Sequence, residues 1–284
     1  MAANREQRSI VAAGEDFNVV ILAGQRAGIV NPIAERAGVS HKCLAPICGK
    51  PLILHVFEML AKVPGVARVR ISQERDGWDG VRDLTGVLDE AGIPVDFVPS
   101  HRTLTDSVNG ALADIDGPTL ITTADNVLTT REAVLETMRP IFAGADASVG
   151  LTRREAVIAA RGESREEGER NVGAYRFRDG HWCNCNLYAV AGRHVTQATE
   201  AFREGGQFAK NRGRLIRAVG LANTLLLASG LVSLDGGMRR LSKRFGIRIA
   251  AARLDDGSQA VDVDSFRTYD FAEKILTQRQ AAVG

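Results

Sequence analysis

The sequence predicts an α/β fold in which a mostly parallel sheet is flanked by helices. Short apolar runs rich in β-branched residues, at 18–23 and 119–123, have the length and composition of buried parallel strands. Segments with helical spacing, at 51–62 and 130–142, alternate with such runs. This alternation through the first half of the chain favours right-handed crossovers between parallel strands of one sheet.

The other elements follow from the same patterns, with Pro51 in a first turn and Thr130 as a helix cap. Residues 160–171, ARGESREEGERN, are charged and contain glycine, which predicts a mobile surface loop. The remaining predicted strands are 67–72, 95–98, 147–152, 184–190, 247–252 and 260–263, and the remaining predicted helices are 80–91, 106–114 and 266–278.

Charge and composition exclude some classes of function. The 284 residues carry a formal net charge of only +2, so the charge balance does not indicate a nucleic-acid partner. The N-terminal sequence MAANREQRSIVAAGEDFN is too polar for a signal peptide, and residues 1–15 are predicted to be a flexible leader. We therefore expect a cytoplasmic protein.

The four cysteines, Cys43, Cys48, Cys183 and Cys185, do not match the usual spacings of zinc ligands. No histidine accompanies them at ligand spacing. We expect reduced structural thiols, as in most cytosolic proteins, with a metal or redox role as the alternative.

The segment 19–54 carries most of the functional information. It contains VVILAGQRAG and later SHKCLAPICGKPLI. Small residues after a strand let backbone N–H groups approach a triphosphate, because a bulky Cβ would block that approach. Arg26 and Lys42 could then neutralise the charge that builds on the phosphates during transfer. A plain strand-loop-helix connection with surface cations is the alternative interpretation.

These residues resemble the signature of the MobA-like NTP transferases and of nucleotidyltransferases similar to methylerythritol-phosphate cytidylyltransferase and the sugar-phosphate nucleotidyltransferases. Their pattern is Leu-Ala-(Gly/Ala)-Gly-x-(Gly)-x-Arg, followed by Lys and by Gly-(Lys/Arg)-Pro-(Leu/Met). The resemblance implies a GT-A-like fold with a helical acceptor-side elaboration in the C-terminal half. It also implies that Leu22, Ala23, Gly24 and Gln25 contact the nucleotide and that Arg26 and Lys42 are catalytic. Gln25 stands where a second glycine is common, and 27–41 is longer than in compact members.

A second match is SHRTLTDSVNGAL at 100–112, which resembles the Arg-x-x-Ser-Val-x-x-Gly-Leu region of the methylerythritol-phosphate cytidylyltransferases. The resemblance implies that Ser107 opens a helix and helps to read the nucleotide, and it favours CTP among the NTPs. A serine at a helix start can present its hydroxyl and nearby N–H groups to a polar ligand. A simple helix cap at Asp106 or Ser107 is the alternative.

Three aspartates are the candidate metal ligands. Asp125 follows the strand at 119–123, where a carboxylate would face the crevice that binds ligands in α/β sheets. If 260–263 is a strand, alternation puts Asp262 and Asp264 on one face, within reach of the same ion. Carboxylates suit Mg²⁺, and the resemblance implies the same ligand set. The alternatives are helix caps at Asp125, Asp264 or Ser265.

The acceptor side is less distinct. Asn184 and Asn186 in HWCNCN could bind hydroxyl groups, and Arg214 lies in a basic stretch that could hold an acceptor phosphate. Turn-forming asparagines and a solvated basic face are the alternatives. The uncharged run 218–234 is too short and too interrupted for a confident membrane span, so a core helix pair is expected, with peripheral membrane contact as a hypothesis.

We therefore expect one nucleotidyltransferase domain at 16–284, with a nucleotide-binding part at 16–152 and an acceptor-binding, metal-completing part at 153–284. The expected reaction is Mg²⁺-dependent transfer of a nucleoside monophosphate from an NTP to a phosphorylated small molecule. A GT-A glycosyltransferase using a nucleotide-sugar and a non-catalytic nucleotide-binding protein are the alternatives. The segment 22–28 lacks Gly-x-Gly-x-x-Gly spacing, which argues against a dinucleotide-binding oxidoreductase.

Overall fold

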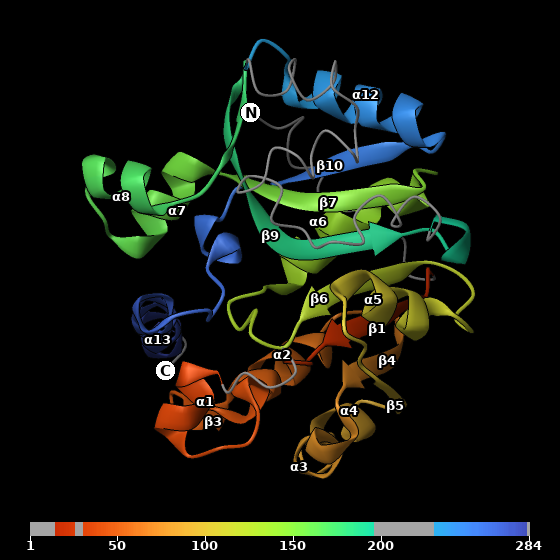
Figure 1. Cartoon of the computed structure of the whole chain (residues 1–284), viewed down its shortest axis with the longest axis vertical. Helices are drawn as coiled ribbons and strands as arrows, with labels where there is room; N and C mark the ends of the chain where they lie inside the picture. The colour runs from red at the N-terminus through yellow and green to blue at the C-terminus, as the bar shows by residue number, and fades with distance from the viewer. Residues whose placement is uncertain (1–14, 26–30, 196–229, 283–284) are drawn as a thin grey trace.

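The computed structural model describes residues 15–25, 31–195 and 230–282. An eight-stranded sheet lies at its centre, with strand order β10-β7-β9-β6-β1-β4-β5 and with β8 paired to β9 (Figure 1). The strands are β1 (Phe17–Leu22), β4 (Val66–Gln73), β5 (Val95–Pro99), β6 (Thr119–Thr123), β7 (Ala147–Arg153), β8 (Tyr175–Phe177), β9 (Gly180–Val190) and β10 (Ile249–Leu254).

Strand direction brings the functional segments to one edge of this sheet. β1 is parallel to β4 and β6, β4 is parallel to β5, and β7 is parallel to β10. β9 runs antiparallel to both β6 and β7, so β6 and β7 point the same way. The carboxyl ends of β1, β4, β5, β6, β7 and β10 therefore share one edge, which is where open α/β sheets bind ligands.

Helices cover both faces of the sheet (Figure 1). α2 and α6 pack on one face, and α5 and α12 pack on the other. The helices are α1 (Pro32–Ala37), α2 (Leu52–Leu60), α3 (Trp78–Arg82), α4 (Gly86–Glu90), α5 (Leu104–Leu112), α6 (Arg131–Phe142), α7 (Arg154–Arg161), α8 (Arg165–Asn171), α12 (Leu234–Phe245) and α13 (Phe266–Ala281). Short 3₁₀ helices are η2 (Lys42–Leu44), η3 (Arg75–Gly77), η4 (Arg193–Val195) and η7 (Gly257–Ala260), and β2 (Pro46–Ile47) pairs with β3 (Lys50–Pro51).

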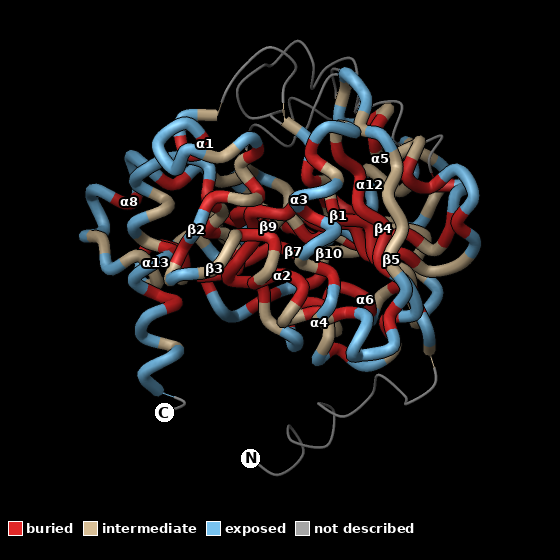
Figure 2. Tube along the Cα trace, turned by 90° about the horizontal axis from the view of Figure 1, so that it is seen from below, coloured by how far each residue is buried: buried red, intermediate tan, exposed pale blue. Residues whose placement is uncertain are grey.

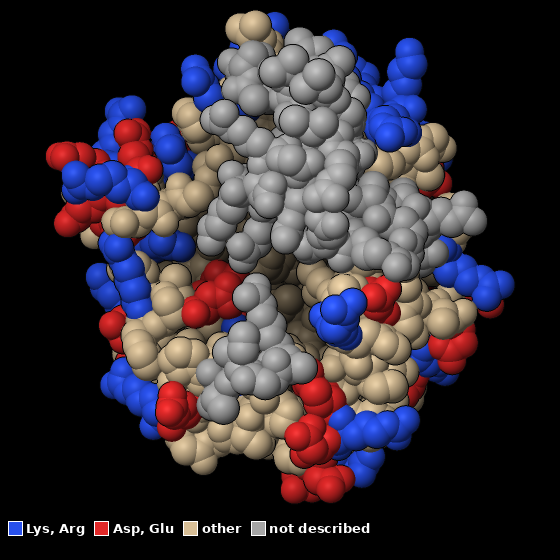
Figure 3. Space-filling view, in the orientation of Figure 1, with Lys and Arg blue, Asp and Glu red and all other residues tan. Residues whose placement is uncertain are grey.

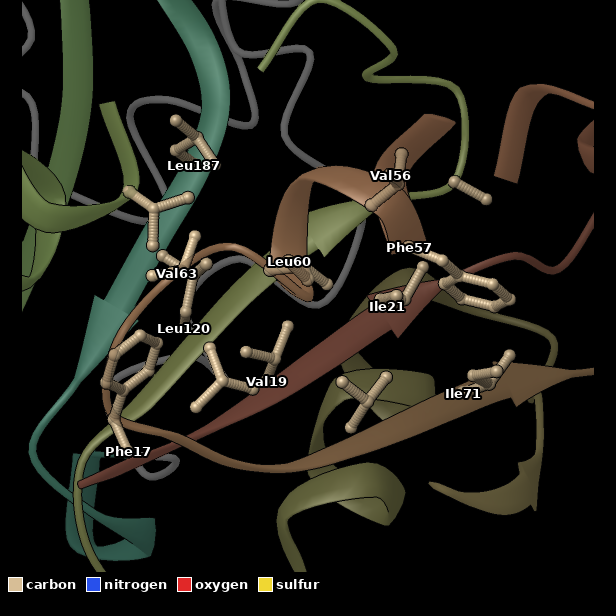
Figure 4. Packing of buried hydrophobic residues seen from close by; sticks show 14 of the residues in the cluster. Phe17, Val19, Ile21, Val56, Phe57, Leu60, Val63, Ile71, Leu120 and Leu187 are labelled. Atoms are coloured by element: carbon tan, nitrogen blue, oxygen red, sulfur yellow. The ribbon is translucent and has the colours of Figure 1, made fainter. Parts of the chain in front are cut away.

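The core lies between these layers, and the sheet is its most deeply buried part (Figure 2). Alternation along β1 sends Val19 and Ile21 toward α2, where Phe57 and Leu60 meet them (Figure 4). Val20 points to the opposite face and joins the cluster under α5. A strand that is buried on both faces has a continuous run of apolar residues. This is why the apolar run at 18–23 predicts a buried strand.

The predicted α/β fold with a mostly parallel sheet is confirmed. Thr130 caps α6 by accepting the N–H of Ala133 at 3.2 Å, as expected. The predicted helix at 80–91 is divided into α3 and α4, and no strand forms at 260–263, where η7 and an irregular segment lie instead. Instead of pairing with a strand of the sheet, this part of the chain packs against α7, and the buried Gly257 of η7 makes the closest approach.

The predicted loop at 160–171 is wrong, because α7 ends at Arg161 and α8 follows at once. The start of α8 is fixed by a capping box in which Ser164 and Glu167 satisfy each other's backbone N–H groups. Gly168 faces Ile158 so closely that any Cβ there would overlap it. The glycine that suggested a loop is therefore a contact point between the two helices.

The run 218–234 lies mostly outside the described residues. Within the described part of the chain, no helix is long and apolar enough to cross a membrane. All four cysteines are free thiols, as expected, and Cys43, Cys183 and Cys185 are buried. Burial raises the pKa of Cys183 to about 11, which keeps this thiol protonated near neutral pH.

Candidate active site

The predicted nucleotide loop begins where β1 ends. Leu22 closes β1, Ala23 is buried, and Gly24 lies against Ser100 at the end of β5. A Cβ on Gly24 would come within 2.9 Å of the Ser100 Cβ, so a larger residue would push the loop away from the sheet. Gln25 donates its side-chain amide to the Ser40 carbonyl oxygen at 3.0 Å. Arg26 lies outside the described residues.

Glu74 is a site residue that the sequence patterns did not identify. It follows β4, and its carboxylate accepts the Gln25 backbone N–H at 3.1 and 3.2 Å and the Ser100 hydroxyl at 2.8 Å. It thereby joins the ends of β1, β4 and β5. The signal available in the sequence was its position directly after a buried strand, which is the same signal that identified Asp125.

Lys42 and two of the predicted aspartates meet at the same edge of the sheet. The Lys42 ammonium hydrogen-bonds to the Asp125 carboxylate and, at 2.8 Å, to that of Asp264. Asp125 is 7% exposed, and the turn that carries it is fixed by Asn126, whose amide donates to the Cys185 carbonyl at 2.9 Å. Residues more than 80 positions apart are thus joined through one cation.

Asp262 completes the group although its segment is not a strand. Val261 and Val263 are fully buried, so Asp262 and Asp264 both point away from the core. The Val263 N–H donates to the backbone carbonyl of Asp125 at 3.2 Å, which holds the two acidic segments together. Asn186 of β9 donates to the Asp262 carboxylate at 2.8 Å.

These three aspartates fit a divalent cation. One carboxylate oxygen from each of Asp125, Asp262 and Asp264 lies within 4.8 Å of the others, as oxygens that share one ion must. Carboxylate oxygens are the ligands that Mg²⁺ prefers, and the Asn186 amide orients one of them from outside. The residues present therefore fit the metal that the sequence predicted.

The charges of the cluster interact strongly. Burial, together with the charges of Asp264 and Asp125, raises the pKa of Asp262 to about 7. Burial alone would also raise the pKa of Asp264, but the Lys42 ammonium outweighs it and leaves that pKa below its ordinary value. Burial would lower the pKa of Lys42, but the carboxylates of Asp125 and Asp264 outweigh it and raise that pKa, so Lys42 is charged at neutral pH.

The raised pKa of Asp262 predicts how stability changes with pH in the metal-free protein. Between about pH 4 and pH 7 the folded state holds a proton that the unfolded state has lost, so the free energy of unfolding falls as pH rises through this window. Asp262→Asn should remove most of this decrease in the free energy of unfolding. The control Asp79→Asn changes an exposed aspartate and should leave the decrease in place. Thermal unfolding in EDTA across the window measures both, and equal slopes in wild type and Asp262→Asn would contradict the assignment.

Ser107 is placed differently from expectation. Ser107 lies in the first turn and a half of α5, and the N-cap is Thr103, which accepts the Asp106 N–H at 3.1 Å. The buried Ser107 hydroxyl accepts the His101 N–H at 2.8 Å, so it supports the loop before the helix. The predicted helix start at Asp106, and a cap at Asp106 or Ser107, are therefore wrong.

Asn184 and Asn186, which the sequence predicts to contact the acceptor, lie in β9 beside the acidic cluster. The Asn184 side-chain amide donates to the side-chain oxygen Oδ1 of Asn186 at 3.0 Å and also hydrogen-bonds to the Tyr188 hydroxyl. Asn186 adopts a positive φ of 51°, which asparagine tolerates better than most residues. Arg214 lies outside the described residues. Asn184 therefore orients Asn186, which in turn contacts Asp262.

Comparison with known proteins shows the fold. No family model matches the chain, and no curated protein matches it. A hypothetical transferase from Thermus thermophilus is similar over 89% of this chain and 99% of its own, with a TM-score of 0.68 and 23% identity. A 4-diphosphocytidyl-2C-methyl-D-erythritol synthase from Anaerococcus prevotii has a TM-score of 0.57 and 13% identity, and covers 93% of this chain and 97% of its own.

An inositol-1-phosphate CTP transferase from T. maritima is also similar, with a TM-score of 0.56, 13% identity and coverage of 93% of this chain and 97% of its own. These proteins agree with this chain over almost their whole length, while their sequences have diverged. The likeness confirms the fold that the sequence resemblance predicted. The chain therefore shares the α/β fold of these proteins.

Proposed function

We propose that this protein transfers a nucleoside monophosphate from an NTP to a phosphorylated small molecule and releases pyrophosphate. The observation that carries the proposal is the meeting of Lys42 with Asp125, Asp262 and Asp264 at the carboxyl edge of the sheet. The loop at Gly24 and Gln25 leaves the same edge. A phosphate-rich substrate needs positive charge and close approach to backbone N–H groups. At this edge Lys42 and a cation held by the three aspartates would supply the positive charge, and the loop at Gly24 and Gln25 would allow the close approach.

Each residue then has a role that follows from its contacts. Asp125, Asp262 and Asp264 would hold Mg²⁺, which when bound would neutralise and orient the NTP phosphates. Lys42 places its ammonium where negative charge develops as an oxygen of the acceptor phosphate attacks the α-phosphorus and pyrophosphate leaves. An acceptor phosphate is already ionised near neutral pH, so the reaction needs no general base.

CTP is the favoured NTP in this proposal. Two of the similar structures are named for cytidine chemistry, one as a diphosphocytidyl compound synthase and one as a CTP transferase. Asn184 and Asn186 adjoin the acidic cluster from the β9 side, which supports an acceptor with hydroxyl groups near its phosphate.

The test is release of pyrophosphate from each of the four NTPs with Mg²⁺ and a panel of sugar, alditol and alcohol phosphates, with Asp125→Ala as the inactive control. Turnover with one pair, lost in the variant, would establish the reaction and name both substrates. A glycosyltransferase would instead turn over a nucleotide-sugar and release a nucleoside diphosphate. Absence of Mg²⁺-dependent NTP binding would refute the proposal.

A further inference from the structure

Helix α7 places two arginines beside the acidic cluster. Val157 and Ile158 mark its buried face, and Arg154 and Arg161 lie on the same side because residues seven apart are two turns apart. The Cα atoms of the two arginines are about 10 Å apart along the helix axis, a distance that two long arginine side chains can span toward one ligand. α7 follows β7 directly, so both belong to the edge that carries Asp125 and Asp262.

The contact between α7 and η7 fixes the position of these arginines relative to the aspartates. Gly257 of η7 lies so close to the backbone of Ala156 and Val157 that no side chain would fit between them. Five residues later the chain reaches Asp262. Arg161 is near enough to Asp262 for the charge of that carboxylate to oppose the effect of burial, which lowers the arginine's pKa.

The side chain of Arg161 is largely buried, and its hydrogen-bonding capacity is not filled by the described residues. Its side chain is 9% exposed, and its Nε finds no hydrogen-bond partner among the described residues. The Glu163 carboxylate stands 4.0 Å away, beyond hydrogen-bond range, and is hydrogen-bonded by Arg267 instead. Burial lowers the pKa of Arg161, and Glu163 and Asp262 oppose this only in part.

Arg154 is in a similar state. Its side chain is 15% exposed, and its Nε also lacks a partner in the described part of the chain. The nearest carboxylate, Glu169, is 3.6 Å from Nη2 and accepts a hydrogen bond from Arg165 at 3.0 Å. Leaving two largely buried guanidinium groups incompletely paired is costly, and an anion that accepts hydrogen bonds from both would reduce that cost.

We propose that Arg161 and Arg154 bind the phosphate of the acceptor, a role that rests on the proposed function. A planar guanidinium can donate two parallel hydrogen bonds to a phosphate. The predicted nucleotide loop lies on the β1, β4 and β5 side of Asp125, whereas α7 lies on the β9 and β7 side. The acidic cluster thus separates the two substrates, and the arginines hold the second one for attack.

Charged side chains of both signs lie on one face of the molecule (Figure 3). Acidic and basic side chains lie next to each other around a hollow near the centre of the face seen in Figure 3. In Figure 1, α7 and α8 extend from one side of the sheet, near α13. Arg161 and Arg267 both lie over the ring of Phe271 in α13, at 5.5 and 5.7 Å from its centroid, which keeps the guanidinium of Arg161 in place.

The first test measures steady-state kinetics with the NTP and acceptor that the protein turns over. Arg161→Gln should raise KM for the acceptor by about 10- to 100-fold, because a hydrogen-bonded charge pair is lost, and should change KM for the NTP far less. Arg161→Lys, which keeps the charge without the fork, should recover part of the loss. The matched control is Arg170→Gln in α8, whose side chain is 65% exposed. Equal rises in both KM values, or none, would overturn the proposal.

The second test does not depend on turnover. Inorganic phosphate, added in EDTA so that no metal bridges it to the carboxylates, should raise the melting temperature of wild type and Arg170→Gln but not of Arg161→Gln. Arg154→Gln serves if Arg161→Gln does not fold. Equal stabilisation of all variants, or none of the wild type, would overturn the phosphate site. Phosphate binding that needs Arg161 in a protein that binds no Mg²⁺–NTP would keep the site and refute the proposed function.

Discussion

Replacing Lys42 by methionine is expected to lower kcat for pyrophosphate release by about 100- to 1,000-fold, the usual effect of removing one charge that stabilises a transition state. The ammonium contacts Asp125 and Asp264, so it stands where the triphosphate would meet the acidic cluster. The loss should fall on kcat more than on KM for the NTP, because charge grows on the phosphates during transfer. Single-turnover measurement of pyrophosphate release separates the two.

The same substitution should change the response to metal. Without Lys42, the three carboxylates repel one another in the metal-free protein, and no ammonium competes with a cation for Asp125 and Asp264. Mg²⁺ should therefore raise the melting temperature of Lys42→Met more than that of wild type. Lys50→Met is the matched control, since Lys50 is half-exposed and pairs with Glu58 instead. Unchanged kcat with an altered metal response would mean that Lys42 only balances charge.

The sequence predicted the parts of the site that follow from strand position. Asp125 was identified because it follows a buried strand, and Gly24 because small residues follow β1. Both inferences use one local rule: the loop after a parallel strand lies at the ligand-binding edge. Lys42 is predicted as a phosphate-neutralising cation from its segment and as a catalytic residue from the resemblance, and the structure adds its two carboxylate partners.

Asp262 and Asp264 lie on one side of their segment, as predicted, but the physical reason differs from the predicted one. Alternation along a strand was expected, but the segment is irregular, and the burial of Val261 and Val263 directs both carboxylates outward. In a segment that alternates apolar and acidic residues, burying the apolar side chains turns the acidic ones outward, whether or not the backbone forms a regular strand. The side-chain pattern was therefore more reliable than the backbone assignment.

Long-range pairing could not be predicted. Glu74 joins Gln25 across 49 positions, and Asn186 meets Asp262 across 76. Neither pair has a local signature, because each depends on which strands become neighbours in the sheet. The error at 160–171 was local, since Ser164 and Glu167 form a capping box that the sequence contained and that outweighed the glycine beside them.

Replacing Gly257 by alanine is expected to destabilise the protein by about 3 kcal/mol or more and to lower its melting temperature by about 5 to 10 °C. The added Cβ would overlap the backbone of Ala156 and Val157, and backbone cannot rotate away as a flexible side chain can. The least costly response is a shift of α7 away from η7. Thermal and denaturant unfolding measure the loss directly.

That shift should also separate the two substrates kinetically. It would move Arg154 and Arg161 relative to Asp262 while leaving Gly24, Gln25 and Glu74 where they are, because these belong to the opposite part of the sheet edge. KM for the acceptor should therefore rise in Gly257→Ala at temperatures where the protein is folded, with NTP binding retained. Gly86→Ala is the matched control, since nothing lies within 4 Å of its added Cβ, and it should change stability by less than about 1 kcal/mol. A folded Gly257→Ala protein with wild-type affinity for both substrates would show that the contact between α7 and η7 does not position the arginines.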